Sequence, residues 1–354
     1  MLVVIDTGLA TTKVATMDGN VVKADAFASA VVRGLIGRQA GGVYCLGQTT
    51  KNFQIYSVLA CEYGVFPIRA DGFRDPSNTF RRVLVEHAMN SLSVTGETSL
   101  ILTQPAPLLF SGGEDQAATL GDVERSLLRM EIGSIDPSSG LPSASKWKLR
   151  EVAASVETAW AIYDLAIYSP ASAREDLERF TKDHVSVDAI VAIVDIGATG
   201  TRIHYVEWTG ELLPTLVMSQ YHESGCGTEE LAAQIDRRFV ETHGYRDVID
   251  VPELCQDPTI FVAGARTDVS DLVDDAVSAT VDHLNGECLD RLKAEVASGD
   301  VGHVLFVGGG AHTLGKAAAQ DLPGHVVLKV DQPEQAGVRG LLKVRASNDR
   351  GGRS

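Results

Sequence analysis

The chain has 354 residues, of which 44% are apolar and 22% charged, with a formal net charge of −16 and a pI near 5.0. This length suits two domains with separate cores. The acidic balance argues against direct binding to nucleic acid or to an anionic membrane, because phosphate contacts need clustered cations.

We expect a cytoplasmic protein with reduced cysteines. No apolar run is long enough to span a bilayer, and a charge follows too soon after the first residue for a signal peptide. The five cysteines are scattered without a C-x-x-C pair, and the histidines show no metal-ligand spacing. A lysine-bearing P-loop and a complete G-x-G-x-x-G motif are both missing, so neither a P-loop NTPase nor a Rossmann dehydrogenase is supported.

The chain begins with a strand, a glycine turn and a second strand, and the same pattern recurs at residues 190–206. A constant shift of 195 − 6 = 189 positions aligns the acidic residue, the glycine and the cation of the two segments, namely Asp6 with Asp195, Gly8 with Gly197 and Lys13 with Arg202. A carboxylate beside free backbone N–H groups suits a metal–phosphate unit. The repeat therefore predicts two similar halves whose hairpin tips face each other across a cleft.

The middle of the chain is expected to mix strands and helices. A helix is predicted at 79–92 from the spacing of its apolar residues, which are Phe80, Val83, Leu84, Ala88 and Leu92. A strand at 99–103 should end in the proline turn at 104–107. A weak helix at 117–130 and a loop at 137–143 follow, then an alanine-rich helix at 149–167 that Pro170 stops. Residues 171–188 are expected to form a charged surface segment.

After the second hairpin, the segment 225–230 should open a helix with Thr228 as N-cap and with Leu231, Ile235 and Phe239 as its buried stripe. A single long helix is predicted at 271–296, loosened at Gly286. A strand at 303–307, three glycines and a helix from Thr313 follow, and the tail from Ser347 is expected to be disordered. Strands alternating with helices in two halves indicate an α/β fold.

The three glycines, Gly308 to Gly310, come directly after a predicted strand. Without Cβ atoms, the backbone can carry a flat ligand, and the helix that follows favours an anion. A tight turn without a ligand explains the glycines equally well when they are taken alone. Their occurrence after two acidic hairpins favours the ligand.

This ordered trio resembles the actin-like ATPase superfamily. The resemblance implies an actin-like (ribonuclease H-like) duplicated two-domain fold with a nucleotide cleft between the domains. Domain I would comprise residues 1–170 and 326–346, domain II residues 189–325, and residues 347–354 the tail. The segment 333–341 is similar to the one with which members of the superfamily return to the first domain.

Within the superfamily, the chain is most similar to the bacterial plasmid-segregation actins of the ParM/StbA type. The opening Met-Leu-Val-Val-Ile-Asp-Thr-Gly, the strand and turn at 100–105, and the segment 157–163 carry this likeness. The last of these is similar to the family's Glu-Ser-x-x-Ala-Gly-Tyr, so the resemblance implies that Glu157 is the catalytic glutamate. A solvated glutamate on a helix surface is the alternative interpretation.

The resemblance also implies a set of nucleotide-binding residues, which are Asp6, Gly8, Thr11, Thr12, Lys13, Asp195, Gly197, Ala198, Thr199, Gly200, Gly308, Gly309, Gly310 and Ala311. Mg²⁺ would bind at Asp6 and Asp195 through water. Lys13 would reach the phosphates, although a strand-end lysine in solvent is the simpler alternative. Ala10 and Ala198 stand where relatives often carry glycine or a polar residue.

The resemblance implies an ATPase, with GTP also open as the nucleotide, that assembles with itself into filaments and moves plasmid or similar DNA through a ParR-like DNA-binding adaptor. The alternatives are a sugar-type kinase of the same fold and a non-enzymatic adaptor with a decayed nucleotide site. The kinase is disfavoured because no sugar signature is found, and the adaptor because both aspartates and the glycines are present.

Overall fold

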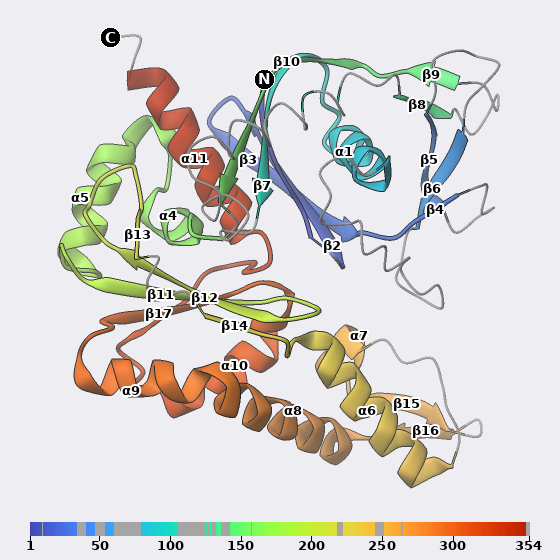
Figure 1. Cartoon of the computed structure of the whole chain (residues 1–354), viewed down its shortest axis with the longest axis vertical. Helices are drawn as coiled ribbons and strands as arrows, with labels where there is room; N and C mark the ends of the chain where they lie inside the picture. Colours follow the sequence, from blue (N-terminus) through green and yellow to red (C-terminus); the bar gives the residue numbers. More distant parts are fainter. Residues whose placement is uncertain are drawn as a thin grey trace. The chain divides into compact units, whose positions relative to one another are not determined.

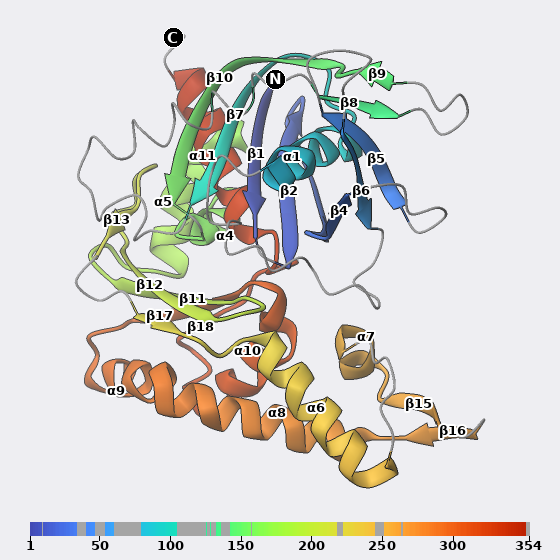
Figure 2. The same cartoon turned by 45° about the vertical axis from the view of Figure 1, so that its right-hand side comes forward.

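The computed structural model describes residues 1–8, 10–33, 40–46, 54–59, 79–104, 125, 128, 132–135, 142–156, 158–217, 222–244, 251–262 and 265–351. The chain divides into two compact units (Figures 1 and 2). The first unit contains Met1–Asp176 and Gly337–Ser354, and the second contains Leu177–Ala336. In the described part of the chain, no helix is long and apolar enough to cross a membrane.

The first unit is built on a five-stranded sheet with the order β10-β7-β1-β2-β3. Its strands are β1 (Leu2–Thr7), β2 (Thr11–Asp18), β3 (Val21–Ala28), β7 (Gly96–Gln104) and β10 (Trp147–Val156). The first three strands form antiparallel hairpins, whereas β7 lies parallel to both β1 and β10. The first predicted hairpin and the predicted strand at 99–103 are confirmed.

A second sheet of this unit has the order β4-β6-β5-β8-β9 and is antiparallel. Its strands are β4 (Val31–Arg33), β5 (Ala40–Leu46), β6 (Gln54–Leu59), β8 (Ile132–Ile135) and β9 (Pro142–Ala144). The predicted turn at 104–107, helix at 117–130 and loop at 137–143 fall largely outside the described residues.

Helix α1 (Thr79–Ser91) packs against both sheets of the first unit. Val85 and Met89 belong to the core of the five-stranded sheet, and Val83 and Leu84 to that of the second sheet. The helix predicted at 79–92 is therefore confirmed. The prediction that its apolar residues lie on one side only is wrong. Two opposite faces of the helix are buried because a sheet lies on each.

The predicted helix at 149–167 is wrong over most of its length. Residues up to Val156 belong to β10, and only Ala161–Ala166 form a helix, α4. Alanine favours a helix over other ordinary residues by less than about 0.7 kcal/mol each. A strand along β7 gains a ladder of hydrogen bonds and buries Val152 and Val156, which outweighs that preference.

The segment expected from residue 171 to be a charged surface stretch begins with the short helix η2 (Pro170–Ser172) and continues as α5 (Ala173–Asp183). Leu177 and Phe180 bury one side of α5. Most of the acidic and basic residues that suggested a surface segment lie on its exposed side; Asp176 is buried and accepts hydrogen bonds from the N–H groups of Tyr168 and Ser169. The pattern is that of an amphipathic helix.

The C-terminal helix α11 (Ala336–Gly351) lies across the five-stranded sheet from α1 (Figures 1 and 2). Asp164 of α4 accepts hydrogen bonds from Arg339 and forms an ion pair with Lys343 at 2.8 Å. The tail expected to be disordered from residue 347 is helical to Gly351, and the hydroxyl of Ser347 donates to the carbonyl of Lys343 at 2.7 Å. The residues from Ser347 to Gly351 continue a helix that packs on the rest of the first unit. The local composition of the tail does not reveal this packing.

The second unit repeats the strand arrangement of the first. Its strands are β11 (Ile190–Ile196), β12 (Thr201–Glu207), β13 (Thr215–Leu216), β14 (His222–Ser224), β17 (His303–Val307) and β18 (Val327–Leu328). Their order is β13-β12-β11-β17-β18, with β14 also paired to β12. Asp6 pairs with Lys13 in the first hairpin and Asp195 with Arg202 in the second. The predicted internal repeat is thus confirmed at the level of strand register.

The helices of this unit are α6 (Thr228–His243), α7 (Val251–Gln256), α8 (Ser270–Leu284), the π-helical turn η4 (Asn285–Leu289), α9 (Asp290–Ser298), η5 (Gly309–His312), α10 (Leu314–Ala318) and η6 (Ala319–Asp321). A separate hairpin joins β15 (Thr259–Val262) to β16 (Ala265–Asp268). The π-helical turn interrupts the long helix predicted at 271–296, and Gly286, where loosening was predicted, lies within it.

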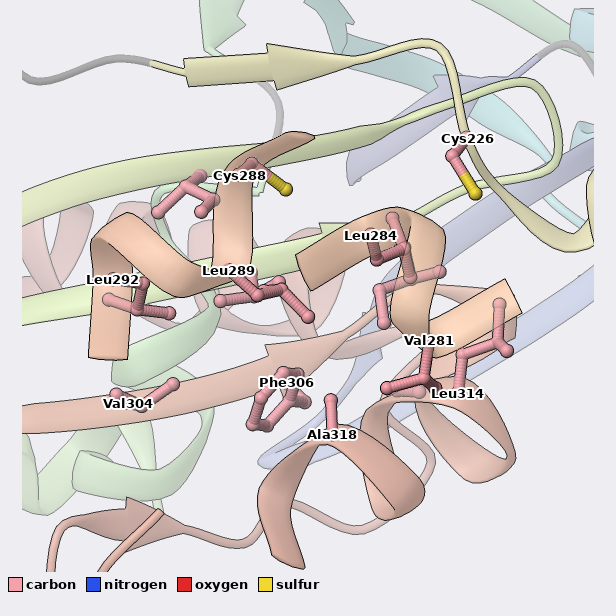
Figure 3. Packing of buried hydrophobic residues seen from close by; sticks show 14 of the residues in the cluster. Cys226, Val281, Leu284, Cys288, Leu289, Leu292, Val304, Phe306, Leu314 and Ala318 are labelled. Atoms are coloured by element: carbon pink, nitrogen blue, oxygen red, sulfur yellow. The ribbon is translucent and has the colours of Figure 1, made fainter. Parts of the chain in front are cut away.

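The core of the second unit contains buried residues of the sheet and of α6, α8 and α10. Figure 3 shows the part of it between β17, α8 and α10. Leu231, Ile235 and Phe239 form the buried stripe of α6, as predicted. The N-cap is Gly227, however, not Thr228, and no side chain caps the helix. Phe306 of β17 and Leu284 of α8 lie in the same cluster, so the strand that carries the glycine turn is anchored in this core.

We predict that Gly340→Ala destabilises the first unit whereas Gly286→Ala does not destabilise the second. A Cβ at position 340 would overlap the carbonyl oxygen of Trp160. A Cβ at position 286 would have no atom of another residue within 4 Å apart from its chain neighbours and its own helix backbone. Gly340→Ala should lower the free energy of unfolding by about 1–3 kcal/mol through overpacking. Gly286→Ala should raise it by up to about 1 kcal/mol through helix propensity. Urea unfolding of both variants measures this, and equal stabilities would contradict the packing of α11 described above.

Candidate functional site

The first hairpin tip places a carboxylate between two donors. Asp6, at the end of β1, is 8% exposed. Its Oδ2 accepts from Lys13 Nζ at 2.8 Å, and its Oδ1 accepts from the Thr103 hydroxyl at 3.0 Å. Lys13 is therefore not a solvated strand-end lysine, because its ammonium is held at the tip. Whether it also reaches a phosphate stays a prediction.

Arg81 is a second cation at this tip that the sequence analysis did not single out. Its Nε donates to the Thr7 hydroxyl at 2.7 Å and its Nη2 to the carbonyl of Thr103 at 3.3 Å. Only 3% of the residue is exposed. The sequence signal that could have indicated Arg81 is a pair of adjacent arginines in a predicted helix with several apolar residues. The second of them, Arg82, forms a buried ion pair with Glu86 instead.

The other residues expected at the first tip are placed by the turn itself. A Cβ at Gly8 would lie 2.7 Å from the carbonyl oxygen of Thr11, so this position needs glycine. The hydroxyl of Thr12 is fully buried and bonds to that of Ser29 at 2.8 Å. Thr11, by contrast, is half-buried. Thr12 thus supports the tip from within the protein.

The second hairpin tip is a compact turn. The N–H of Gly197 donates to the carbonyl of Gly200 at 2.9 Å. A Cβ at Gly200 would lie 2.5 Å from the carbonyl oxygen of Ser224. Thr199 is the exposed residue of the turn. Asp195 precedes the turn, as Asp6 does in the first unit.

The N-terminus of α6 closes against this second tip. The N–H groups of Thr228 and Glu229 donate to the carbonyls of Gly197 and Ala198 at 3.0 and 2.9 Å. A Cβ at Gly227 would lie 2.5 Å from both carbonyl oxygens. The glycine before the helix is therefore required by the contact between the two segments, and two of the helix's first N–H groups are already satisfied by the protein.

The glycine turn after β17 also packs against the second hairpin and the start of α6. Because β17 pairs with β11, Val307 lies opposite Asp195. Gly308 has φ 85, and a Cβ there would collide with Asp195 Oδ1. A Cβ at Gly310 would collide with Ile196 and lie 3.0 Å from Thr228 Cγ2.

The three glycines of this turn therefore have different roles. Gly308 and Gly310 are needed by packing inside the protein. Their contact with a nucleotide stays a prediction. Gly309 is exposed, and nothing lies within 4 Å of a Cβ built on it. Only at Gly309 does the bare backbone leave open space of the kind a flat ligand would use. Ala311, the next residue but one, is buried.

His204 lies on β12, the strand that pairs with the strand of Asp195, and its pKa departs from its ordinary value. Burial lowers the pKa of His204 to about 4, and the charge of Asp195 opposes this shift. The imidazole is therefore neutral near pH 7. Arg202, the cross-strand partner of Asp195, forms an ion pair with Glu223 at 3.2 Å.

Glu157, the expected catalytic residue, lies outside the described residues. Its two neighbours along the chain are described. β10 ends at Val156, and Thr158 has φ 61, a left-handed conformation that is unusual for a β-branched residue. Such backbone strain is often found at functional sites.

We predict that Gly308→Ala destabilises the second unit and that Gly309→Ala leaves its stability unchanged. Gly308→Ala places a side chain at a positive φ and against Asp195. Gly309→Ala adds a methyl group where nothing lies within 4 Å. The expected loss for Gly308→Ala is about 1–3 kcal/mol, measured by thermal or urea unfolding without ligand. Equal stability of the two variants would show that the turn does not pack on the hairpin tip.

Comparison with known proteins finds relatives in structure. No family model and no curated protein sequence matches the chain. A non-polymerisable quadruple mutant of pCBH ParM superposes with a TM-score of 0.71 at 17% identity, covering 100% of this chain and 99% of that one. An archaeal actin homologue, Ta0583, in complex with ADP gives a TM-score of 0.69 at 14% identity, covering 100% and 99%. A 15-stranded ParM filament from Clostridium botulinum gives 0.68 at 15%, covering 98% and 99%.

These matches extend over nearly the whole of each chain. Together with the duplicated strand order, they show that the chain has the actin-like fold that the sequence predicted.

Proposed function

We propose that the chain is a nucleotide-dependent, filament-forming actin-like ATPase that segregates plasmid or similar DNA through a DNA-binding adaptor. The observation that carries the proposal is the duplicated hairpin. In both units an aspartate pairs with a cation in the same register, next to a glycine turn, within an actin-like fold. The solved structures most relevant here are a protein complexed with ADP and a filament.

The residues present suit a nucleotide with Mg²⁺. Carboxylates at Asp6 and Asp195 are hard oxygen donors of the kind that Mg²⁺ prefers, usually together with water and substrate phosphates. Among the described residues, no three His, Cys, Asp or Glu side chains are grouped closely enough to hold a metal. In this proposal, phosphate oxygens and water would therefore complete the coordination. The open backbone at Gly309 offers a surface for the base.

The remaining residues of the proposed site have distinct tasks. The γ-phosphoryl group of the nucleotide would be the electrophile, and Mg²⁺ would neutralise charge on the phosphate oxygens. Lys13, held by Asp6, places a positive charge at the first tip, and the turns at Gly8 and 197–200 present backbone to the phosphates. Glu157 orients the attacking water, since phosphoryl transfer depends mainly on positioning and charge stabilisation.

Filament formation and the adaptor complete the proposal. The net charge of −16 makes the chain a poor ligand for DNA by itself, because counterion release needs cationic contacts. A ParR-like adaptor would supply those contacts. A sugar-type kinase of the same fold is the second candidate, and the experiments below separate the two.

We expect Mg·ATP or Mg·GTP to bind the purified chain and to raise its light scattering by assembly. Asp195→Asn should weaken nucleotide binding about tenfold or more and suppress the scattering, since the carboxylate would hold the Mg²⁺ of the nucleotide through water. Asp274→Asn, on an exposed position of α8, is the matched control and should behave like the wild type. Calorimetry and light scattering measure the two effects.

The outcomes distinguish the candidate functions. No uptake of any purine triphosphate would refute both the ATPase and the filament. Uptake without scattering at high protein concentration, together with phosphorylation of an added sugar, would favour the kinase.

We expect Glu157→Gln to slow phosphate release about 100-fold while leaving assembly intact or prolonged, because the side chain acts on water and not on the nucleotide. Glu151→Gln is the matched control, since Glu151 is exposed near the middle of β10 and should leave hydrolysis unchanged. A phosphate-release assay decides the matter. Equal rates in the two variants would remove Glu157 from its catalytic role.

A further inference from the structure

The long helix of the second unit is interrupted by a π-helical turn at residues 285–289, between α8 and α9. Cys288 and Leu289 of this turn are buried in the core (Figure 3). Glu287 is half-exposed and belongs to the same turn. Such turns inside helices are uncommon and often accompany functional sites.

Glu287 reaches the segment that links β14 to α6. Its Oε2 accepts a hydrogen bond from the Ser224 hydroxyl at 2.5 Å, and the N–H of Gly225 also donates to the carboxylate. His283 Nε2 lies 3.4 Å from Oε1. The Ser224 hydrogen bond is the main reason that the pKa of Glu287 lies below its usual value, so the carboxylate is ionised at neutral pH.

The linking segment in turn supports the second hairpin tip. The Ser224 hydroxyl also accepts from the N–H of Cys226 at 3.0 Å. The carbonyl of Cys226 accepts from the Thr201 hydroxyl at 2.8 Å, and that of Ser224 lies directly against Gly200. A continuous chain of contacts therefore runs from the π-helical turn to the residues at 197–201.

We propose that Glu287 is a positioning residue for the phosphate-binding side of the nucleotide site, a role that rests on the function proposed above. Its ionised carboxylate ties down Ser224 and Gly225, and these residues hold the hairpin tip at Gly200 and Thr201. Hydrogen bonds to charged groups are stronger than those between neutral ones, so a single carboxylate can hold this short segment. The π-helical turn brings Glu287 to the segment while its neighbour Cys288 stays in the core.

The first test follows the opening of the segment without any nucleotide. Cys226 is 1% exposed, and burial raises the pKa of its thiol to about 12, so it reacts with a thiol reagent only when the segment opens. Glu287→Ala should speed its labelling about tenfold. Asp290→Ala, an exposed acidic residue at the start of α9, is the matched control. Labelling is followed by mass spectrometry of the peptide that contains Cys226.

Equal labelling rates in Glu287→Ala and Asp290→Ala would overturn the proposal. A faster rate fully explained by a lower global stability in urea would overturn it as well.

The second test separates positioning from general support. Glu287→Ala should weaken the binding of the purine triphosphate about fivefold to tenfold and leave the binding of the nucleoside unchanged. Glu287→Gln, which keeps one acceptor oxygen, should recover part of the loss. Ser224→Ala should have a similar effect, and the loss in the double variant should be smaller than the sum of the two single losses, because both variants remove the hydrogen bond between Ser224 and Glu287.

The outcomes keep the two proposals apart. Additive effects of Glu287→Ala and Ser224→Ala, or equal losses for triphosphate and nucleoside, would overturn the role of Glu287 while leaving the ATPase intact. A wild type that binds no purine triphosphate would overturn the proposed function and this role with it, and the labelling of Cys226 would still show whether Glu287 holds the segment.

Discussion

Three backbone turns of the second unit approach one another so closely that glycine is required where they meet. Gly200 lies against Ser224, Gly227 against the carbonyls of the hairpin tip, and Gly308 against Asp195. Side chains at these positions would force apart the hairpin, the start of α6 and the end of β17. The position of the Asp195 carboxylate thus depends on the absence of three methyl groups, because protein interiors are packed too densely to absorb them.

The duplicated fold creates two similar tips, but the surroundings make them chemically different. Asp6 is bound by Lys13 and Thr103, with the buried Arg81 close by. At the second tip, the equivalent cation, Arg202, forms an ion pair with Glu223. Lys13 is thus held on the aspartate of the first tip, and hydrogen bonds between backbone segments support the second tip. The same strand register thus occurs in two chemically unlike surroundings.

Support for these tips comes from parts of the chain that are far away in sequence. Thr103 and Arg81 serve the first tip from β7 and α1, and Glu287 serves the segment behind the second from a π-helical turn. At 14–17% identity, the three solved relatives retain the fold over nearly their whole length. An arrangement of strands and turns can be kept while most of its supporting side chains change, since many apolar sequences fill a core of the same shape.

The sequence by itself determined the α/β class, the repeated hairpins, the strand before the glycines and the buried stripe of α6, because these depend on short-range patterns of apolar residues and turn residues. It also identified the candidate aspartates and glycines. Only the tertiary structure decided that the alanine-rich stretch before Val156 is a strand, that α11 continues to Gly351, and that Gly308 and Gly310 serve internal packing. Partners distant in sequence, such as β7 for β10 and Asp195 for Gly308, decided these features, and no local pattern encodes such contacts.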